Sequence, residues 1–281
     1  MTTRWLRGAE PTLLHRLAAA ERIFCFVDYD GTLAPLAARP EAAVPPAGTA
    51  ALLRELAATP GLALALVTGR TIADLRRYLD VPGIYYVGVH GLELGLPNGT
   101  VELSKSAAVM RTLIPAIKRE VEQVLVSRPG VVLEDKGVAL ACHYRLASRA
   151  DAEIARDAVT SIVRRYCRRG ARIALLDGHE VIEIRCAWAN KGKAVCRLLA
   201  THGPPALAVY LGDDRTDEDA FRLLPPDAIT IRVGPARGPT AARYRAADPA
   251  AVRQFLRAIV ACRRGWRHAA AEMPGGYVRH G

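Results

Sequence analysis

The sequence predicts an α/β protein: a doubly wound, Rossmann-like parallel sheet that carries a smaller, inserted α+β domain. Short apolar runs that end in polar residues and glycine alternate with helical segments in both the first and the last third of the chain. Between them, the pattern of one helix followed by two strands occurs twice. We therefore assign residues 1–106 and 188–281 to the core domain and residues 107–187 to the insertion.

The core is expected to begin with a helical lead-in over residues 1–20. Strands buried on both faces of a parallel sheet are apolar throughout, and five runs have this character: residues 23–27, 62–67, 85–89, 206–211 and 229–233. Leu52, Leu53 and Leu56 have helical spacing and predict a helix over residues 49–58. The residues after Arg263 have the composition of a loose tail. In such a sheet, ligands bind at the carboxyl ends of the strands.

The insertion is expected to contain helices over residues 106–126 and 150–166 and strands over residues 131–134 and 138–144. Two further strands, over residues 173–176 and 180–185, would form a hairpin. Asp177-Gly178 predicts the turn between them, because this dipeptide readily supplies the positive φ angles of a tight turn. Two similar halves would then build one small module.

The net charge of +11 is spread along the chain and not gathered in one basic segment. Such a charge suits a small anionic substrate, and without zinc-finger spacing or an RNA-binding aromatic motif we expect no nucleic-acid partner. No apolar run approaches the roughly 18 to 20 residues that cross a bilayer. The six cysteines never occur as Cys-x-x-Cys, so we expect free thiols, a reducing compartment and a cytoplasmic location. The sequence identifies no protein partner.

The first chemical motif, Asp28-x-Asp30-Gly31-Thr32, directly follows the strand predicted at residues 23–27. Asp28 at the end of that strand could attack phosphorus as a nucleophile and form an aspartyl phosphate. Asp30 could offer its carbonyl to a cation and its carboxyl as a general acid to the leaving oxygen. The alternative is an ordinary Asp-Gly turn after a strand.

The second motif, residues 212–219, contains five acidic residues within seven positions and follows another predicted strand. Closely spaced carboxylates repel one another without a cation, and hard oxygen ligands suit magnesium. We expect Asp213 to complete a Mg²⁺ site with Asp28 and the Asp30 carbonyl, while Asp214 or Asp217 orients the neighbouring ligands. The alternative is an acidic first turn of a helix that starts near residue 219.

Two further segments have the residue types that bind a phosphoryl group. Thr68 of Thr68-Gly69-Arg70 follows the strand at residues 62–67, where its hydroxyl and nearby N–H groups could bind phosphoryl oxygens. Lys191 opens a predicted helix and could neutralise charge on the nucleophile and the transferring group. Taken alone, Thr68 could be a helix cap and Lys191 a solvated lysine.

The order of these four motifs resembles that of the haloacid dehalogenase superfamily of phosphohydrolases, and the insertion is similar to the α/β cap of that superfamily. Within it, the chain resembles the trehalose-6-phosphate phosphatases, on the strength of Glu134-Asp135-Lys136-Gly137, His143-Tyr144-Arg145, Glu183-Ile184-Arg185 and the residues from Leu211 to Phe221. The resemblance implies that trehalose 6-phosphate is hydrolysed with Mg²⁺ and that four cap residues hold glucose hydroxyls: Glu134, Lys136, Arg145 and Glu183.

The resemblance also places His90, with Thr68, Gly69 and Arg70, among the residues that contact substrate. The chain departs from the family pattern in two places. Val89 stands where asparagine is common before His90, and Cys186-Ala187-Trp188 stands where proline and glycine are frequent. These departures affect the substrate loop and the hinge, and they leave the phosphate chemistry untouched.

Two other functions remain open at this stage. One is a phosphatase of another sugar phosphate, such as sucrose 6-phosphate or mannosyl-phosphoglycerate. The other is a catalytically silent sugar-phosphate sensor that regulates the synthase of the substrate. The complete set of Asp28, Asp30, Lys191 and Asp213 favours an enzyme, because a pure binding protein needs no nucleophile.

Overall fold

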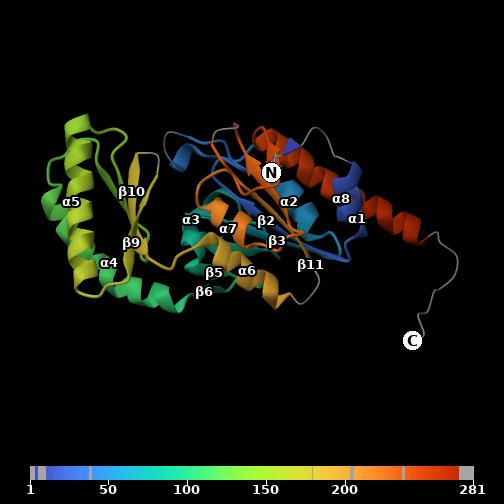
Figure 1. The fold of residues 1–281 in the computed structure, drawn as a ribbon, viewed down its shortest axis with the longest axis horizontal. Coiled ribbons are helices and arrows are strands. Elements are labelled where there is room, and N and C mark those ends of the chain that lie inside the picture. The colour runs from blue at the N-terminus through green and yellow to red at the C-terminus, as the bar shows by residue number, and fades with distance from the viewer. Residues whose placement is uncertain are drawn as a thin grey trace.

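The computed structural model describes residues 4–5, 11–37, 40–178, 180–202, 206–235 and 238–271. Among these residues the strands form two sheets, one of nine strands and one of four. Figure 1 shows the four-stranded sheet and its helices at the left, and the nine-stranded sheet with its helices at the right. The chain passes from the larger unit into the smaller one before α4 and returns after β10.

The larger sheet has the order β1-β13-β12-β11-β2-β3-β4-β5-β6. Its pairs are parallel from β1 to β4, and β5 and β6 add an antiparallel edge. The strands are β1 (Arg4–Trp5), β2 (Arg22–Asp28), β3 (Leu62–Val67), β4 (Tyr85–Gly88), β5 (Glu93–Gly95), β6 (Val101–Leu103), β11 (Ala206–Gly212), β12 (Ile229–Val233) and β13 (Tyr244–Ala246). The central position of β2 places its end, Asp28, between the ends of β3 and β11.

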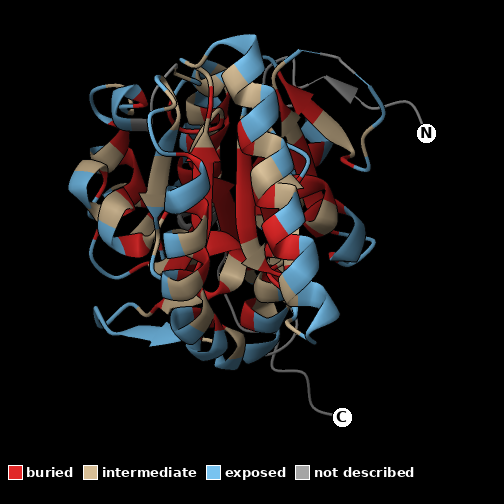
Figure 2. Cartoon of the chain, turned by 90° about the vertical axis from the view of Figure 1, so that its left-hand side faces the viewer, coloured by how far each residue is buried: buried red, intermediate tan, exposed pale blue. Residues whose placement is uncertain are grey.

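Helices cover both faces of this sheet. On one face lie α1 (Pro11–Ala19), α2 (Thr49–Ala57), α3 (Ile72–Tyr78) and α8 (Pro249–Ala271), and on the other lie α6 (Lys191–Thr201) and α7 (Asp217–Leu223). The sheet is buried because apolar side chains from both helical layers pack on it. Figure 2 views the molecule from the side of the four-stranded unit, and it shows buried strands in the interior behind helices whose outer faces are exposed. Short 3-10 helices, η1 (Pro40–Ala42) and η2 (Val89–Gly91), lie in the loops.

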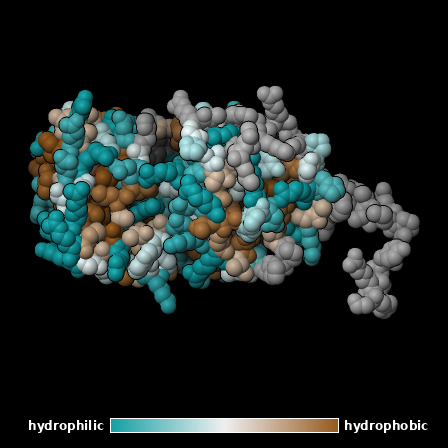
Figure 3. Space-filling model, in the orientation of Figure 1, coloured by the Kyte–Doolittle hydropathy of each residue, from teal (hydrophilic) through white to brown (hydrophobic). Residues whose placement is uncertain are grey.

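The smaller unit contains an antiparallel sheet of order β7-β8-β10-β9. Its elements are α4 (Lys105–Val124), β7 (Val132–Asp135), β8 (Leu140–His143), α5 (Arg149–Arg168), β9 (Ile173–Asp177) and β10 (Val181–Cys186). A hydrophobic cluster joins both helices to one face of the sheet. In Figure 3 the larger hydrophobic patches of the face in view lie over this unit.

The predicted fold class is confirmed, and the apolar runs of the core are strands at nearly the expected bounds. The hairpin of β9 and β10 is confirmed, although among the described residues of its turn the positive φ angle lies at Glu180. Two local predictions were wrong. The lead-in includes the strand β1, which pairs with β13. The helix α8 continues to Ala271 through part of the expected tail, whose remaining residues lie outside the described ones. No helix in the described part of the chain is long and apolar enough to span a membrane.

Candidate active site

Asp28 ends the central strand of the large sheet, and its residue is only 3% exposed. The chain reverses immediately afterwards through Gly31, which has a φ angle of 78°. A Cβ atom at Gly31 would lie 2.0 Å from Oδ2 of Asp213, so only glycine lets these two segments approach. The glycine thereby brings Asp213, which follows β11, to the end of β2.

Lys191 is buried at the first position of α6 and forms two ion pairs. Its Nζ donates to Oδ1 of Asp28 at 2.7 Å and to Oδ1 of Asp217 at 2.9 Å. Asp217 also accepts from the Tyr210 hydroxyl at 2.8 Å and from the Asp214 N–H at 3.0 Å. These four hydrogen bonds hold Lys191 in one position between the two carboxylates. Because Lys191 binds Oδ1 of Asp28, the other oxygen, Oδ2, is available to bind a ligand.

Three carboxylates form a cluster that fits a divalent metal ion. Asp28, Asp213 and Asp217 each offer an oxygen, and these oxygens lie within 4.8 Å of one another. Burial and the charge of Asp217 raise the pKa of Asp28, although Lys191 lowers it. Burial, Asp217 and Asp214 raise the pKa of Asp213 to about 7. Lys191 therefore offsets only part of what burial and neighbouring carboxylates cost the charged forms, and oxygen ligands of this kind suit Mg²⁺.

The acidic residues after β11 have two structural roles. Asp214 bonds to Thr216, whose hydroxyl lies 2.7 Å from its Oδ1, and it is not part of the cluster. The helix α7 begins at Asp217, two residues before the expected start, so Asp217, Glu218 and Asp219 occupy its first turn. These three acids complement the helix dipole, but Asp217 also anchors Lys191. The two interpretations of this motif therefore both apply.

The Thr68-Gly69-Arg70 segment follows β3, next to Asp28. The buried Thr68 hydroxyl accepts from the Arg70 N–H at 3.1 Å. The Arg70 guanidinium pairs with Asp30 through Nε at 2.9 Å and Nη2 at 2.6 Å, and with Asp74 at 3.1 Å. It thus lies beside the expected general acid and holds both of its oxygens. No sequence pattern indicates this pair, because the two residues are 40 positions apart.

The sequence model of the trehalose-phosphatase family matches residues 26–250, which include every element of this site. The chain belongs to the trehalose-phosphatase family. It is 37% identical to the trehalose-phosphate phosphatase of Mycobacterium marinum over 241 residues, 82% of this chain and 59% of that protein. The chain thus spans less than two thirds of the length of that relative.

Solved structures agree with this assignment. A trehalose-6-phosphate phosphatase related protein superposes with a TM-score of 0.75 and 27% identity, over 87% of this chain and 99% of its own. A haloacid dehalogenase-like hydrolase from Bacteroides thetaiotaomicron superposes with a TM-score of 0.58 over 85% and 99%, at 15% identity, a level that shows the fold alone. The chain therefore has the haloacid dehalogenase-like fold.

Several of the residues expected to contact substrate lie where the two units meet. Lys136, after β7, donates to Oε2 of Glu183 on β10 at 2.6 Å and to the Gly69 carbonyl at 3.1 Å. His90 places Nε2 3.6 Å from Oε1 of Glu183. Two of the four residues expected to bind sugar hydroxyls, Lys136 and Glu183, thus meet His90 beside the Thr68-Gly69-Arg70 segment.

The other two expected sugar-binding residues have different partners. Glu134 accepts from His143 at 2.9 Å, a partner that the sequence did not reveal although both lie on paired strands. Arg145 pairs with Glu180 at 3.3 Å and donates to the carbonyl of Ala37 at 3.2 Å. The contact with Ala37 joins the four-stranded unit to the loop after the nucleophile.

The turn that carries His90 has unusual backbone geometry. Val89 and His90 have φ angles of 44° and 54°, and Gly91 follows at 98°. A β-branched residue in the left-handed region is strained by about 1 to 3 kcal/mol. This turn packs the His90 ring against Gly69, where a Cβ atom would lie 2.8 Å from Nε2. Burial, together with the charges of Lys191, Arg185 and Lys136, lowers the pKa of His90, which keeps the ring neutral.

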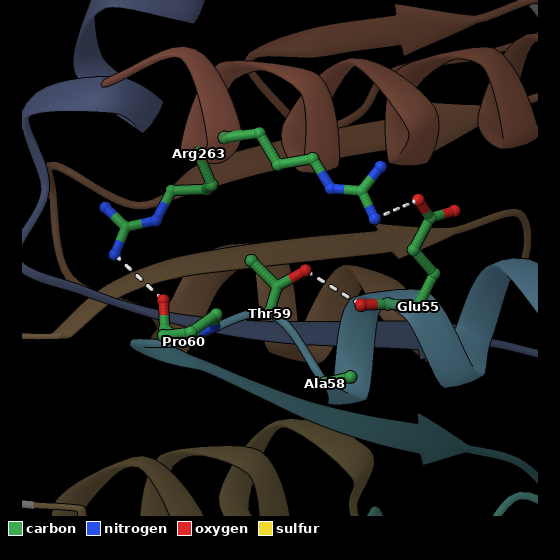
Figure 4. Close-up of a pocket in the computed structure, with 6 residues that line it drawn as sticks. Glu55, Ala58, Thr59, Pro60 and Arg263 are labelled. Atoms are coloured by element: carbon green, nitrogen blue, oxygen red, sulfur yellow. Dashed lines mark hydrogen bonds and ion pairs between the residues drawn. The ribbon is translucent and has the colours of Figure 1, made fainter. Parts of the chain in front are cut away.

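A pocket at the amino-terminal ends of the strands of the large sheet does not belong to this site. It is lined by Glu55, Ala58, Thr59, Pro60, Arg263 and Arg264, beside the amino end of β3. Figure 4 shows that its polar groups bind one another: Arg263 donates to the Pro60 carbonyl and Thr59 to that of Glu55. Its volume of about 240 Å³ is below the roughly 300 to 1,000 Å³ typical of ligand sites.

Proposed function

We propose that the protein is a magnesium-dependent phosphatase that hydrolyses trehalose 6-phosphate to trehalose and phosphate through an aspartyl-phosphate intermediate. The observation that carries this proposal is the buried Lys191–Asp28 pair beside the Asp213 cluster, in a chain of the trehalose-phosphatase family. A carboxylate whose one oxygen is fixed by a buried lysine is suited to nucleophilic attack on a phosphate ester. The relative from M. marinum bears the name of this activity.

In the first step, Oδ2 of Asp28 forms a bond to phosphorus while the bond from phosphorus to the sugar oxygen breaks. Lys191 holds Oδ1 and neutralises charge as the phosphoryl group transfers. Asp30 gives a proton to the departing sugar oxygen, for which one of its oxygens must leave Arg70. Asp30 then takes a proton from water, which attacks phosphorus and releases Asp28.

Asp28 and Asp213 with the Asp30 carbonyl would hold Mg²⁺, and Asp217 with Asp214 would orient these ligands. When bound, the ion neutralises the carboxylates and the phosphoryl oxygens. Gly31 supports this arrangement, since it allows the Asp213 carboxylate to lie against the nucleophile loop. The Thr68 hydroxyl and the N–H groups of Gly69 and Arg70 would bind phosphoryl oxygens.

The unit formed by residues 107–187 would act as a cap that closes over the sugar. Its contacts with the core, Lys136 to Gly69 and Arg145 to Ala37, support this role because they join it to the segments that follow β3 and the nucleophile. Glu134, Lys136, Arg145 and Glu183 alternate between acceptors and donors, and with His90 they would bind sugar hydroxyls. Closure would exclude bulk water from the first step.

The location that we propose is the cytoplasm, and the substrate is a small molecule. Support comes from the six cysteines, all of which are free thiols in the structure. Disulfides are rare in reducing compartments. The proposal names no protein partner.

A panel of sugar phosphates tests the activity. We expect kcat/KM for trehalose 6-phosphate to exceed that for glucose 6-phosphate and sucrose 6-phosphate by at least about tenfold, since additional sugar contacts would contribute at least about 1.4 kcal/mol. The Asp28→Asn variant is the control for contaminating phosphatases. Similar efficiencies on unrelated hexose phosphates would refute the trehalose assignment, and turnover by Asp28→Asn would refute the nucleophile.

A further inference from the structure

The Arg70 side chain is buried between two carboxylates. Its Nε and Nη2 atoms donate to Oδ2 and Oδ1 of Asp30 at 2.9 and 2.6 Å. Its Nη1 atom donates to Oδ2 of Asp74 at 3.1 Å. The arginine side chain is 7% exposed, whereas those of Asp30 and Asp74 are 36% and 29% exposed. One guanidinium therefore joins the loop after β2 to the first turn of α3.

Two tyrosine rings pack against the same guanidinium. Its Cζ atom lies 5.0 Å from the centroid of the Tyr29 ring and 5.3 Å from that of the Tyr78 ring. Tyr29 is fully buried, and its hydroxyl donates to the Ala43 carbonyl at 2.8 Å. Tyr78 lies four residues after Asp74 on α3, so the two share a face of that helix. Ring contacts of this kind stabilise a guanidinium and restrict its movement.

The contact with Asp74 bears on the proposed work of Asp30 as the general acid. Both oxygens of Asp30 accept from Arg70, and one of them must be released before it can reach a leaving group. A guanidinium that was held by Asp30 alone would follow the carboxyl group as it turned. The hydrogen bond to Asp74 does not involve Asp30, so it keeps the guanidinium in place during the release.

Asp74 also has contacts of a purely structural kind. It lies in the first turn of α3, where an acid complements the helix dipole, and it pairs with Arg77 at 3.6 Å. The cap of this helix, however, comes from the Thr71 side chain, which accepts from the Asp74 N–H at 3.1 Å. A structural role predicts a loss of stability and equal effects on all substrates. A role through Arg70 and Asp30 predicts an effect that depends on the leaving group.

We propose that Asp74 is a positioning residue of the general-acid step. By holding Arg70, it allows Asp30 to turn one oxygen toward the leaving group while the other oxygen stays bound to the guanidinium. Asp74 itself does not touch the substrate. This inference rests on the proposed phosphatase function, and it adds a residue that lies outside the four motifs.

The dependence of kcat/KM on the leaving group tests the proposal. This ratio covers the steps up to departure of the leaving group, so the later reaction of Asp30 with water does not affect it. Asp74→Asn should lower kcat/KM by about 10- to 100-fold for trehalose 6-phosphate and glucose 6-phosphate, because general acids contribute about 10²- to 10⁴-fold and depend on exact placement. For p-nitrophenyl phosphate, whose leaving group departs without a proton, the loss should be less than about threefold.

Two matched variants serve as controls. Asp74→Glu keeps the carboxylate and should restore most of the lost efficiency. Asp80→Asn removes the same charge from a side chain that is 70% exposed and pairs with Arg76, and it should change neither class of ester. Equal losses on sugar phosphates and p-nitrophenyl phosphate in Asp74→Asn would overturn the proposal, as would unchanged efficiency. A loss with trehalose 6-phosphate but not with glucose 6-phosphate would also overturn it, because that result indicates a sugar contact.

A crystal structure of Asp74→Asn tests the geometry without turnover. We expect the Arg70 guanidinium to shift away from α3 together with the Asp30 carboxyl group, and parent positions for both would overturn the proposal. Should Asp74→Asn fail to fold, the kinetics of Asp74→Ser on the same esters decide the question. If the parent protein hydrolyses no phosphate ester, the proposed function is refuted, and the structure of the variant still decides whether Asp74 positions Arg70 and Asp30.

Discussion

Replacing Lys191 by methionine should destabilise the protein and increase its dependence on magnesium. Lys191 is 3% exposed and neutralises two buried carboxylates. Removing one partner of a buried ion pair costs about 3 to 5 kcal/mol. Asp217 retains the Tyr210 hydroxyl and the Asp214 N–H as donors, so Asp28 is left with the larger deficit. We therefore expect the free energy of unfolding to fall by about 3 kcal/mol, near the lower end of that range.

Chemical denaturation with EDTA and with saturating magnesium measures this loss. Lys193→Met is the matched control, since Lys193 is exposed on the same helix and should change stability by less than about 0.5 kcal/mol. Magnesium should reduce the deficit of Lys191→Met, because a divalent cation replaces the missing charge. Turnover should fall by at least about 10²- to 10³-fold. A deficit that is unchanged or larger with magnesium would refute the electrostatic argument.

Three further predictions concern the nucleophile, the metal and the sugar. Asp28→Asn should abolish turnover, with thermal unfolding as the check that the fold is intact. Because the raised pKa of Asp213, about 7, lies above that of the unfolded chain, the metal-free protein should gain stability as the pH falls through that value. Protons compete with the metal there, so calorimetry should show magnesium affinity declining below about pH 7 by up to about tenfold per unit; a flat profile would contradict this. Glu183→Gln breaks the ion pair with Lys136 and should reduce kcat/KM for trehalose 6-phosphate by about 10- to 100-fold. For p-nitrophenyl phosphate the same variant should reduce kcat/KM by less than about threefold. The control variant, Glu153→Gln at an exposed position, should change neither value.

The sequence predicted the parts of the fold that depend on local pattern. Buried parallel strands are apolar on both faces, so β2, β3, β11 and β12 were found at nearly their observed bounds. The strands β5 and β6 were missed because each has three residues and neither has a continuous apolar run. The strand β1 has two residues and exists through its pairing with β13, which no local pattern reveals.

The candidate site was predictable as a set of residues and not as a network. The sequence identified Asp28, Lys191 and Asp213 because each lies at the end of a strand or the start of a helix. Ligands of such sheets bind at the carboxyl ends of the strands. That Asp217 anchors Lys191 depends on side-chain geometry across 26 positions. The Arg70–Asp30 pair is also a tertiary feature. Sequence spacing carries no information about which donor reaches which acceptor.

The central position of β2 has a consequence for synthesis of the chain. One edge of β2 pairs with β3, which follows soon afterwards, but its other partner, β11, begins only at Ala206. At about 5 to 20 residues per second, a ribosome takes roughly 10 to 40 seconds to synthesise the intervening chain. During that time an apolar strand has an unpaired edge, which invites association with other chains. The inserted unit thus delays closure of the sheet, and early truncation products of this protein should aggregate.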